Sequence, residues 1–117
     1  MAKLELSKED VENLVVIAQN GDSEAFARLY DFYVDPIYRY LFFKVSKEDA
    51  MDLTENVFLK VWENLRSYRR GKYYFSSWLF RIAHNTVVDH YRTKKEYLEL
   101  NMDIADDTAQ NSPVMLT

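Results

Sequence analysis

Apolar residues recur every three or four positions along most of the chain, which is the spacing that places them on one face of an α-helix. A first helix is expected after Ser7, a good N-cap, and should end at Asn20-Gly21. A second helix should begin at Asp22 or Ser23. The apolar stripes of this half of the chain are Val11, Leu14, Val15 and Ala18, then Phe26, Leu29, Tyr30 and Tyr33, then Ile37, Tyr38, Leu41 and Phe42.

Pro36 interrupts the second stripe, so it should either start a new helix or kink the existing one. Ser46 should cap the next helix, which is expected from Lys47 to Asn64. Residues 66–75 break the periodicity and include a glycine, which predicts a loop.

The last helix should be capped by Ser76 or Ser77 and run to about Lys95. The core-facing residues of the last two helices are Ala50, Leu53, Val57, Phe58, Val61, Trp62 and Leu65, then Leu79, Ile82, Ala83, Thr86 and Val87. Together the pattern predicts an all-α fold, a compact helical bundle of about four to five helices.

The composition supports one domain with a substantial core, because the chain has 117 residues and 48% of them are hydrophobic. Two Gly and two Pro disfavour an all-β fold, and zero Cys excludes a disulfide scaffold or a thiolate metal site. We expect residues 1–100 to form the domain and the acidic, polar residues 101–117 to form a linker or tail. The sequence shows no signal-peptide core and no apolar run of membrane length, so a soluble, cytoplasmic protein is the default.

Charge is distributed unevenly along the chain. The formal net charge is −4, yet residues 66–95 hold eight Lys or Arg and one acid, while the rest holds seven bases and eighteen acids. The first segment therefore carries +7 and the remainder −11. This asymmetry predicts two surfaces with different kinds of partner.

The expected loop interleaves cations with aromatic rings. Its cations are Arg66, Arg69, Arg70 and Lys72, and its rings are Tyr68, Tyr73, Tyr74 and Phe75. Cations neutralise phosphates, and aromatic faces stack on unpaired bases with about 1–3 kcal/mol per base. The pattern therefore favours contact with single-stranded or opened nucleic acid.

The last helix carries a second face beside its core stripe, within about a 120° arc. Its residues are Trp78, Arg81, Asn85, Val88, Asp89, Arg92 and Lys95. They offer cations for phosphate, amide and carboxylate groups for base edges, and an indole for stacking. The alternative explanation is core packing of the rings and basic side chains that complement the helix dipole.

The helix expected at 47–64 has an acidic face opposite its core stripe. Its residues are Glu48, Asp49, Asp52, Glu55, Asn56, Leu59 and Glu63. A solvated face with one exposed leucine is the simpler interpretation. The alternative is a docking surface for a basic partner protein, with Leu59 as its apolar contact.

His84, Asp89 and His90 are the strongest candidates for a metal or nuclease site. His84 and Asp89 stand about 140° apart around a helix, so their side chains do not converge. The sequence also has no glycine-rich phosphate loop. We therefore expect no enzymatic activity, no metal and no cofactor.

Four stretches, in order, resemble region 2 of the sigma-70 family, in its extracytoplasmic-function (ECF) type. They are Gly21-Asp22 with Ala25-Phe26 and Leu29-Tyr30, then Asp49-Ala50-Met51-Asp52-Leu53, then Val57-Phe58-Leu59-Lys60-Val61-Trp62, then Phe75-Ser76-Ser77-Trp78-Leu79-Phe80-Arg81-Ile82-Ala83-His84-Asn85 with Asp89 and Arg92. The match covers about residues 10 to 95, and the ordered set is what makes it specific.

The resemblance implies an all-helical domain that binds core RNA polymerase and recognises and melts the promoter −10 element through its non-template strand. It implies that the helix at 47–64 docks on the coiled coil of the beta-prime clamp. The residues expected in that contact are Asp49, Asp52, Glu55, Asn56, Leu59 and Glu63.

The resemblance also implies that the loop captures a flipped −10 base and that the last helix contacts the −10 region. Promoter contacts are then expected from Tyr68, Ser76, Trp78, Arg81, Asn85, Asp89 and Arg92. The cations Arg69, Arg70, Lys72 and Lys95 complete the DNA-binding set as phosphate contacts.

The chain departs from the family pattern in two respects. Family members often have Gln followed by an acid in the clamp-binding helix, where this chain has Glu55 and Asn56. A full-length member also has a second helical domain for the −35 element, which nothing after Asn101 supplies. Anti-sigma proteins commonly hold family members inactive, which makes such a protein a candidate partner. The alternative function is a helical interaction module without DNA contact, which leaves the cationic aromatic loop unexplained.

Overall fold

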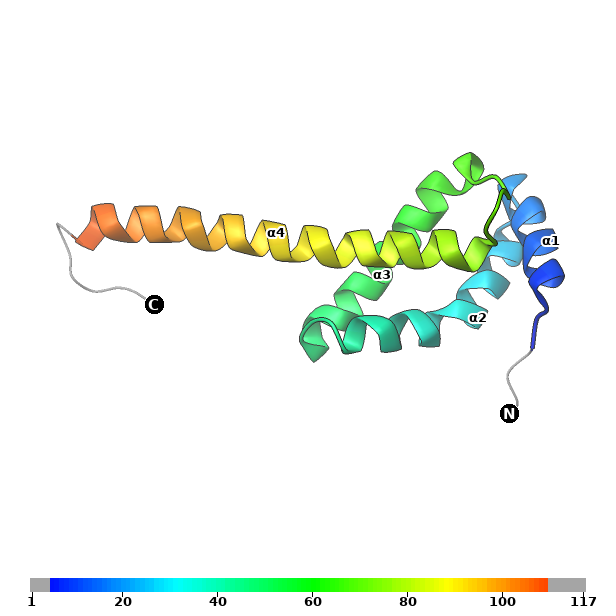
Figure 1. The fold of residues 1–117 in the computed structure, drawn as a ribbon, viewed down its shortest axis with the longest axis horizontal. Helices are drawn as coiled ribbons and strands as arrows, with labels where there is room; N and C mark the ends of the chain where they lie inside the picture. The colour runs from blue at the N-terminus through cyan, green and yellow to red at the C-terminus, as the bar shows by residue number, and fades with distance from the viewer. Residues whose placement is uncertain (1–4, 110–117) are drawn as a thin grey trace. The chain divides into compact units, whose positions relative to one another are not determined.

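The structure, a computed structural model, describes residues 5–109, with side chains through Met102. Its elements are α1 (Lys8–Gln19), α2 (Ser23–Phe42), α3 (Lys47–Asn64), the 3₁₀ turn η1 (Leu65–Ser67) and α4 (Phe75–Ala109) (Figure 1). Residues 5–109 contain no strand, and the predicted all-α fold is confirmed. The chain divides into two units, one ending at Val87 and one starting at Val88, and each is described by itself.

The first three helices begin at caps that the sequence predicts. Ser7 and Asp10 form a reciprocal capping box, with each side chain accepting the other residue's backbone N–H at 3.0 Å. Asp22 and Ser46 each accept the backbone N–H three residues downstream, at 3.1 and 3.2 Å. Gly21 follows α1 with φ of 97°, a left-handed conformation that favours glycine.

Helix α2 continues through Pro36 instead of restarting there. The ribbon of α2 bends along its length (Figure 1), as expected where an internal proline removes a backbone donor. The kink alternative is therefore the one that the structure supports.

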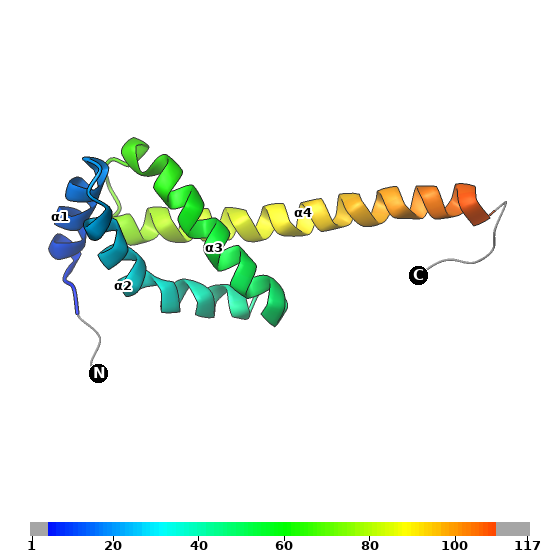
Figure 2. The same ribbon diagram turned by 180° about the vertical axis from the view of Figure 1, so that it is seen from behind.

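The core of the first unit lies between its helices. Figures 1 and 2 show α3 crossing the first turns of α4, and Lys60 Nζ donates to Thr86 Oγ1 at 3.3 Å between them. The largest fully buried side chains are Val15, Leu29, Ile37, Leu41, Val57, Val61, Leu65, Phe75 and Leu79. Trp62 was expected in this core but is 44% exposed. It lies at the margin of the core, where its ring packs edge-to-face on Phe26 with the ring centroids 4.8 Å apart. Phe42, in the last turn of α2, is likewise 42% exposed.

The predicted limits of the last helix are wrong at both ends. α4 begins at Phe75, before the expected serine caps, and continues past Lys95 to Ala109. The extension follows from residues 96–109, which contain good helix formers and neither Gly nor Pro. Residues 101–109 are thus helical, and residues 110–117 lie outside the described part of the chain. The linker or tail expected at residues 101–117 stays a prediction. The assignment of residues 1–100 to the domain stays a prediction.

Two isoleucines provide a test of this core. Ile37→Ala should lower the free energy of unfolding by about 2–5 kcal/mol, because Ile37 is fully buried and its truncation leaves a cavity. Ile17→Ala, at a side chain that is 46% exposed, should cost much less. Urea titrations of both variants measure the difference, and equal midpoints would contradict the described packing.

Candidate nucleic-acid interface

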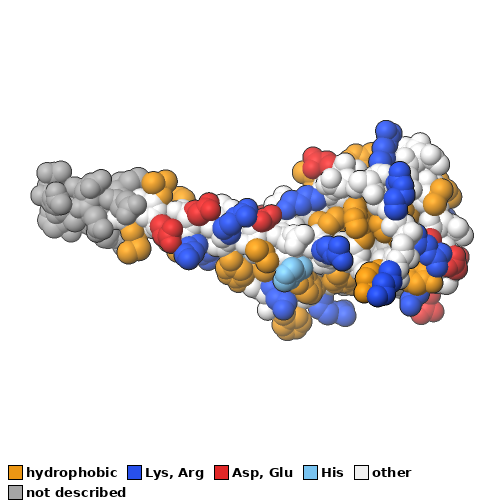
Figure 3. Space-filling view, turned by 45° about the horizontal axis from the view of Figure 1, so that its top comes forward, with side chains coloured by type: hydrophobic (Ala, Val, Ile, Leu, Met, Phe, Trp, Pro, Cys, Tyr) orange, Lys and Arg blue, Asp and Glu red, His pale blue; other side chains and the backbone are white. Residues whose placement is uncertain are grey.

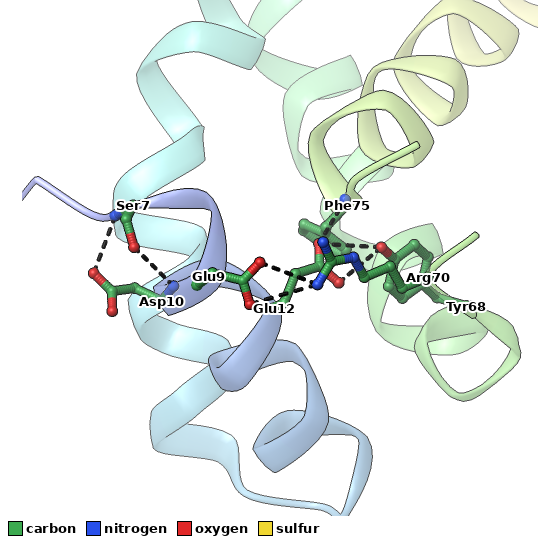
Figure 4. Close-up of polar contacts among 7 residues, drawn as sticks. All are labelled: Ser7, Glu9, Asp10, Glu12, Tyr68, Arg70 and Phe75. Carbon is green, nitrogen blue, oxygen red and sulfur yellow. Dashed lines mark hydrogen bonds and ion pairs between the residues drawn. The ribbon is translucent and has the colours of Figure 1, made fainter. Parts of the chain in front are cut away.

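Residues 68–74 join η1 to α4, and one side chain of α1 holds both ends of this loop. The Glu12 carboxylate accepts the Tyr68 hydroxyl at 2.9 Å (Oε1) and 3.1 Å (Oε2), and Oε2 also accepts the Phe75 N–H at 2.8 Å. Figure 4 shows Glu12 pointing from α1 toward both residues. Glu12 is only 8% exposed, so these donors replace the water that burial removes from the carboxylate.

A second polar side chain of α1 supports the same segment. Gln19 Nε2 donates to the carbonyl oxygens of Leu65 at 3.0 Å and Tyr68 at 2.8 Å. Sequence reasoning missed both Glu12 and Gln19, because these residue types are usually exposed. The available signal was their spacing: they lie seven residues apart on one flank of the α1 apolar stripe.

Tyr68 was expected to stack on a DNA base, and the structure contradicts an open ring at this position. The side chain is 5% exposed and belongs to the core. Its ring packs against Phe75 and Trp78, with centroids 5.4 and 5.3 Å away. Burial and the hydrogen bond to Glu12 raise the pKa of the Tyr68 phenol, so it stays a neutral donor. Tyr68 therefore shapes the loop from inside.

Three cations of the loop lie at the protein surface. Arg69, Arg70 and Lys72 are all exposed. Arg69 Nη1 donates to the carbonyls of Arg66 and Tyr68 at 2.6 and 2.8 Å, which tucks its guanidinium against the backbone. Figure 3 shows Lys and Arg outnumbering Asp and Glu on a face of the first unit.

Tyr74 and Tyr73 organise two of these cations. The Arg70 guanidinium lies over the Tyr74 ring at 4.4 Å and contacts Glu9 at 3.1 Å. Lys72 Nζ lies over the Tyr73 ring at 5.7 Å. Tyr73 is 58% exposed, so its ring, unlike that of Tyr68, is open to a stacking partner.

Four predicted contact residues lie on the part of α4 that follows the loop. Ser76 and Trp78 are half-buried, whereas Arg81 and Asn85 are exposed. Trp78 packs against the ring of Phe75, with centroids 5.5 Å apart, so part of the indole belongs to the core.

Three further predicted contact residues lie on α4 in the second unit. Asp89 and Arg92 form an ion pair at 3.1 Å (Oδ1 to Nη2), and Lys95 lies 4.0 Å from Glu99. Asp89 is half-buried, while Arg92 and Lys95 are exposed. The Asp89 carboxylate therefore already has a cationic partner on its own helix.

The acidic face on α3 is present as expected. Asp52, Glu55, Asn56 and Glu63 are exposed, and Asp49 is half-buried. Leu59 is 55% exposed among them, so it is an apolar side chain that lies outside the core.

No cluster of His, Asp or Glu suited to a metal ion occurs among the residues that the structure describes. His84 is exposed and lies 3.5 Å (Nδ1) from the Tyr40 hydroxyl. None of the described helices is both long and apolar enough to cross a membrane.

The sigma-70 region 2 family model matches residues 25–97. The chain belongs to this family. The match includes α2 from Ala25 onward, α3, the loop and the first part of α4, and it confirms the resemblance of the sequence motifs.

Individual relatives agree with this assignment. The chain is 40% identical over 88 residues to the ECF RNA polymerase sigma factor BldN of Streptomyces coelicolor, covering 74% of this chain and 33% of the relative. It is 33% identical over 88 residues to the ECF sigma factor SigW of Bacillus subtilis, covering 74% of this chain and 46% of SigW. This region 2 chain thus spans a third to a half of the length of these relatives.

A solved structure shows the same fold. It is an engineered region 2 of sigmaE, determined by NMR in complex with GTAAAA. The TM-score is 0.70 at 30% identity, and the alignment covers 85% of this chain and 99% of that one. The family model starts at Ala25, so α1, with Glu12 and Gln19, precedes the matched segment of region 2.

Two buried phenols should make region 2 sensitive to alkali. Burial, and then the charge of Glu12, raise the pKa of Tyr33 to about 12, and the pKa of Tyr68 is also raised. A raised pKa contributes stability below the ordinary value of about 10, and this stability is lost as the pH rises through the folded value. The free energy of unfolding should therefore fall between pH 10 and 12, by about 2–3 kcal/mol for Tyr33.

Urea unfolding at increasing pH measures this loss. Tyr33→Phe should reduce the alkaline fall, whereas Tyr73→Phe, at an exposed ring, should leave it unchanged. An alkaline profile of Tyr33→Phe identical to that of the unmodified chain would contradict the assignment.

Proposed function

We propose that this chain is the part of a sigma factor that binds core RNA polymerase and holds the opened, non-template strand of the promoter −10 element. The observation that carries the proposal is the exposed cationic loop, which Glu12 anchors at both ends and which leads directly into α4 with its exposed Arg81 and Asn85 side chains. The sigmaE region 2 that shares this fold was solved with GTAAAA, which supports DNA as the ligand.

The chemistry of the loop suits an unpaired strand. Arg70 and Lys72 supply phosphate contacts, and the ring of Tyr73 offers an exposed stacking surface. Asn85 and Arg81 can hydrogen-bond the edges of bases that have left the duplex. Because the Tyr68 ring is buried, we assign the base contacts expected from it to these exposed side chains instead.

Melting then follows from differential affinity, without bond chemistry. Extruding a base costs a few kcal/mol, and stacking contributes about 1–3 kcal/mol per base. A surface that binds only the opened strand shifts the duplex–open equilibrium toward the open form.

The acidic face of α3 is proposed as the surface for the beta-prime clamp of core polymerase. Asp52, Glu55 and Glu63 provide negative charge around the exposed Leu59. Such a face recognises a basic partner through charge complementarity, with the leucine as its apolar centre. This role places the protein in the cytoplasm and makes an anti-sigma protein a candidate regulator.

The DNA role predicts a loss of strand binding when the α4 groups are removed. A pool of oligonucleotides with a short randomised segment is first selected on the chain assembled with core polymerase. Arg81→Ala and Asn85→Ala should then each weaken binding of the selected single strand by about 1–3 kcal/mol. Fluorescence anisotropy measures the affinity, and promoter opening should decline in parallel.

Matched controls lie on other helices. Arg39→Ala on α2 and Asn13→Ala on α1 replace exposed residues of the same types and should leave strand binding unchanged. If Arg81→Ala and Asn85→Ala bind as tightly as these controls, α4 is not the DNA surface. Retained polymerase binding without any DNA selection would favour the interaction-module alternative.

The polymerase role predicts an effect of Leu59. Leu59→Ala should weaken capture of core polymerase by about tenfold, since truncation removes the apolar area that the leucine would bury against its partner. Ile17→Ala is the control, because Ile17 is an exposed aliphatic residue on α1. Titration with core polymerase measures the affinity. If Leu59→Ala binds as tightly as the unmodified chain, α3 is not part of the interface.

A further inference from the structure

The loop is closed by a single carboxylate. Glu12 binds the Tyr68 side chain at the first residue of the loop and the Phe75 N–H directly after its last residue. The cations and the exposed ring that the proposed function uses lie between these two points. Glu12 itself is buried, 8% exposed, and cannot reach a strand bound outside.

Glu12 also performs the task that the predicted serine caps do not. The first backbone N–H groups of a helix have no partner within it, and their partial positive charge favours an anion. Oε2 of Glu12 accepts the Phe75 N–H at the first residue of α4. The start of the DNA-facing helix is therefore fixed by a residue of α1, 63 positions earlier in the chain.

Gln19 of α1 also holds the first residue of the loop, through the Tyr68 carbonyl at 2.8 Å, but it does not reach the other end. The remaining contacts between α1 and the loop are weaker restraints. Lys8 lies over the Tyr74 ring at 5.1 Å, and Glu9 pairs with Arg70. The Glu9 and Arg70 side chains are 65% and 44% exposed, and exposed ion pairs contribute little. Among these contacts the buried Glu12 bridge is the one that joins the two ends of the loop to each other.

We propose that Glu12 is a positioning residue for strand capture: its bridge from Tyr68 to Phe75 preorganises the loop and the start of α4 before DNA binds. This inference rests on the proposed function and deepens it, because it assigns to α1 a role in affinity. A loop already ordered in the free protein loses less conformational entropy on binding.

A positioning role and a purely electrostatic role of Glu12 predict opposite changes in the affinity for DNA when the carboxylate is removed. If Glu12 acted only through its charge, its removal would strengthen binding of an anionic strand. A positioning role predicts that Glu12→Ala weakens binding by about tenfold, through ordering cost and lost geometry. Glu12→Gln keeps an acceptor for Phe75 N–H and an amide near the Tyr68 hydroxyl, so it should bind within about twofold of the original chain.

The salt dependence of strand binding provides a readout that does not change when a variant is merely less stable. The loop cations remain in Glu12→Ala, so the slope of log K against log salt should stay unchanged. Lys72→Ala should instead reduce that slope by about 0.7, because one phosphate contact with a single strand is lost. Glu24→Ala, at an exposed acid in the first turn of α2, is the matched control and should change neither quantity.

The experiment uses the 117-residue chain assembled with core polymerase and the single strand selected by the unmodified chain. Circular dichroism sets a temperature at which every variant is folded. Weaker binding by Glu12→Ala at constant slope, with recovery in Glu12→Gln, supports the positioning role. Equal or tighter binding by Glu12→Ala overturns it while leaving the proposed function intact.

A second variant keeps the inference testable if Glu12→Ala does not fold. Tyr68→Phe removes one of the two anchors and should weaken binding by about threefold, whereas Tyr97→Phe, at an exposed ring outside the proposed contact set, should not. Equal affinities of these two variants overturn the inference. If the unmodified chain selects no strand at all, the proposed function fails, and the positioning role fails with it.

Discussion

The buried carboxylate of Glu12 is the contact on which the arrangement of the cationic loop depends. A buried charge is costly unless hydrogen bonds replace its lost water. Here a phenol and a backbone N–H supply them from two segments that are close only when the loop is folded back. The carboxylate is thus satisfied in one loop geometry, and that geometry is specified by α1.

This constraint divides the rings of the segment into two pairs. Tyr68 and Phe75 enter the core at its ends, whereas Tyr73 and Tyr74 stay among the cations, and residues 69–73 are exposed. Arg70 and Lys72 then lie over tyrosine rings, which keeps them near the loop without burying their charge. A loop with the same composition but unanchored ends would have no reason to sort its aromatic and basic residues in this way.

Local signals in the sequence predicted most of the helical framework. Ser7, Asp22 and Ser46 cap their helices through hydrogen bonds to residues three positions away. Both partners of each cap therefore lie within one short stretch of sequence, where the pattern can be recognised. The same reasoning failed at the start of α4, because its first N–H is satisfied by Glu12, a distant partner that periodicity cannot reveal. It failed for Tyr68 as well, since a tyrosine flanked by arginines has the same local pattern whether its ring faces solvent or the core.

The charge distribution gives the proposed function an order of events. The chain carries −4 overall, so DNA at a distance meets a net repulsive protein, and the cationic loop is attractive only nearby. At physiological salt an exposed charge acts over roughly 8 Å. A strand must therefore be brought to the loop before its cations contribute, and the acidic face of α3 offers a separate surface through which a basic partner can hold the domain. In the proposed function, docking through α3 would therefore precede strand capture by the loop, because the forces that favour capture are too short-ranged to initiate it.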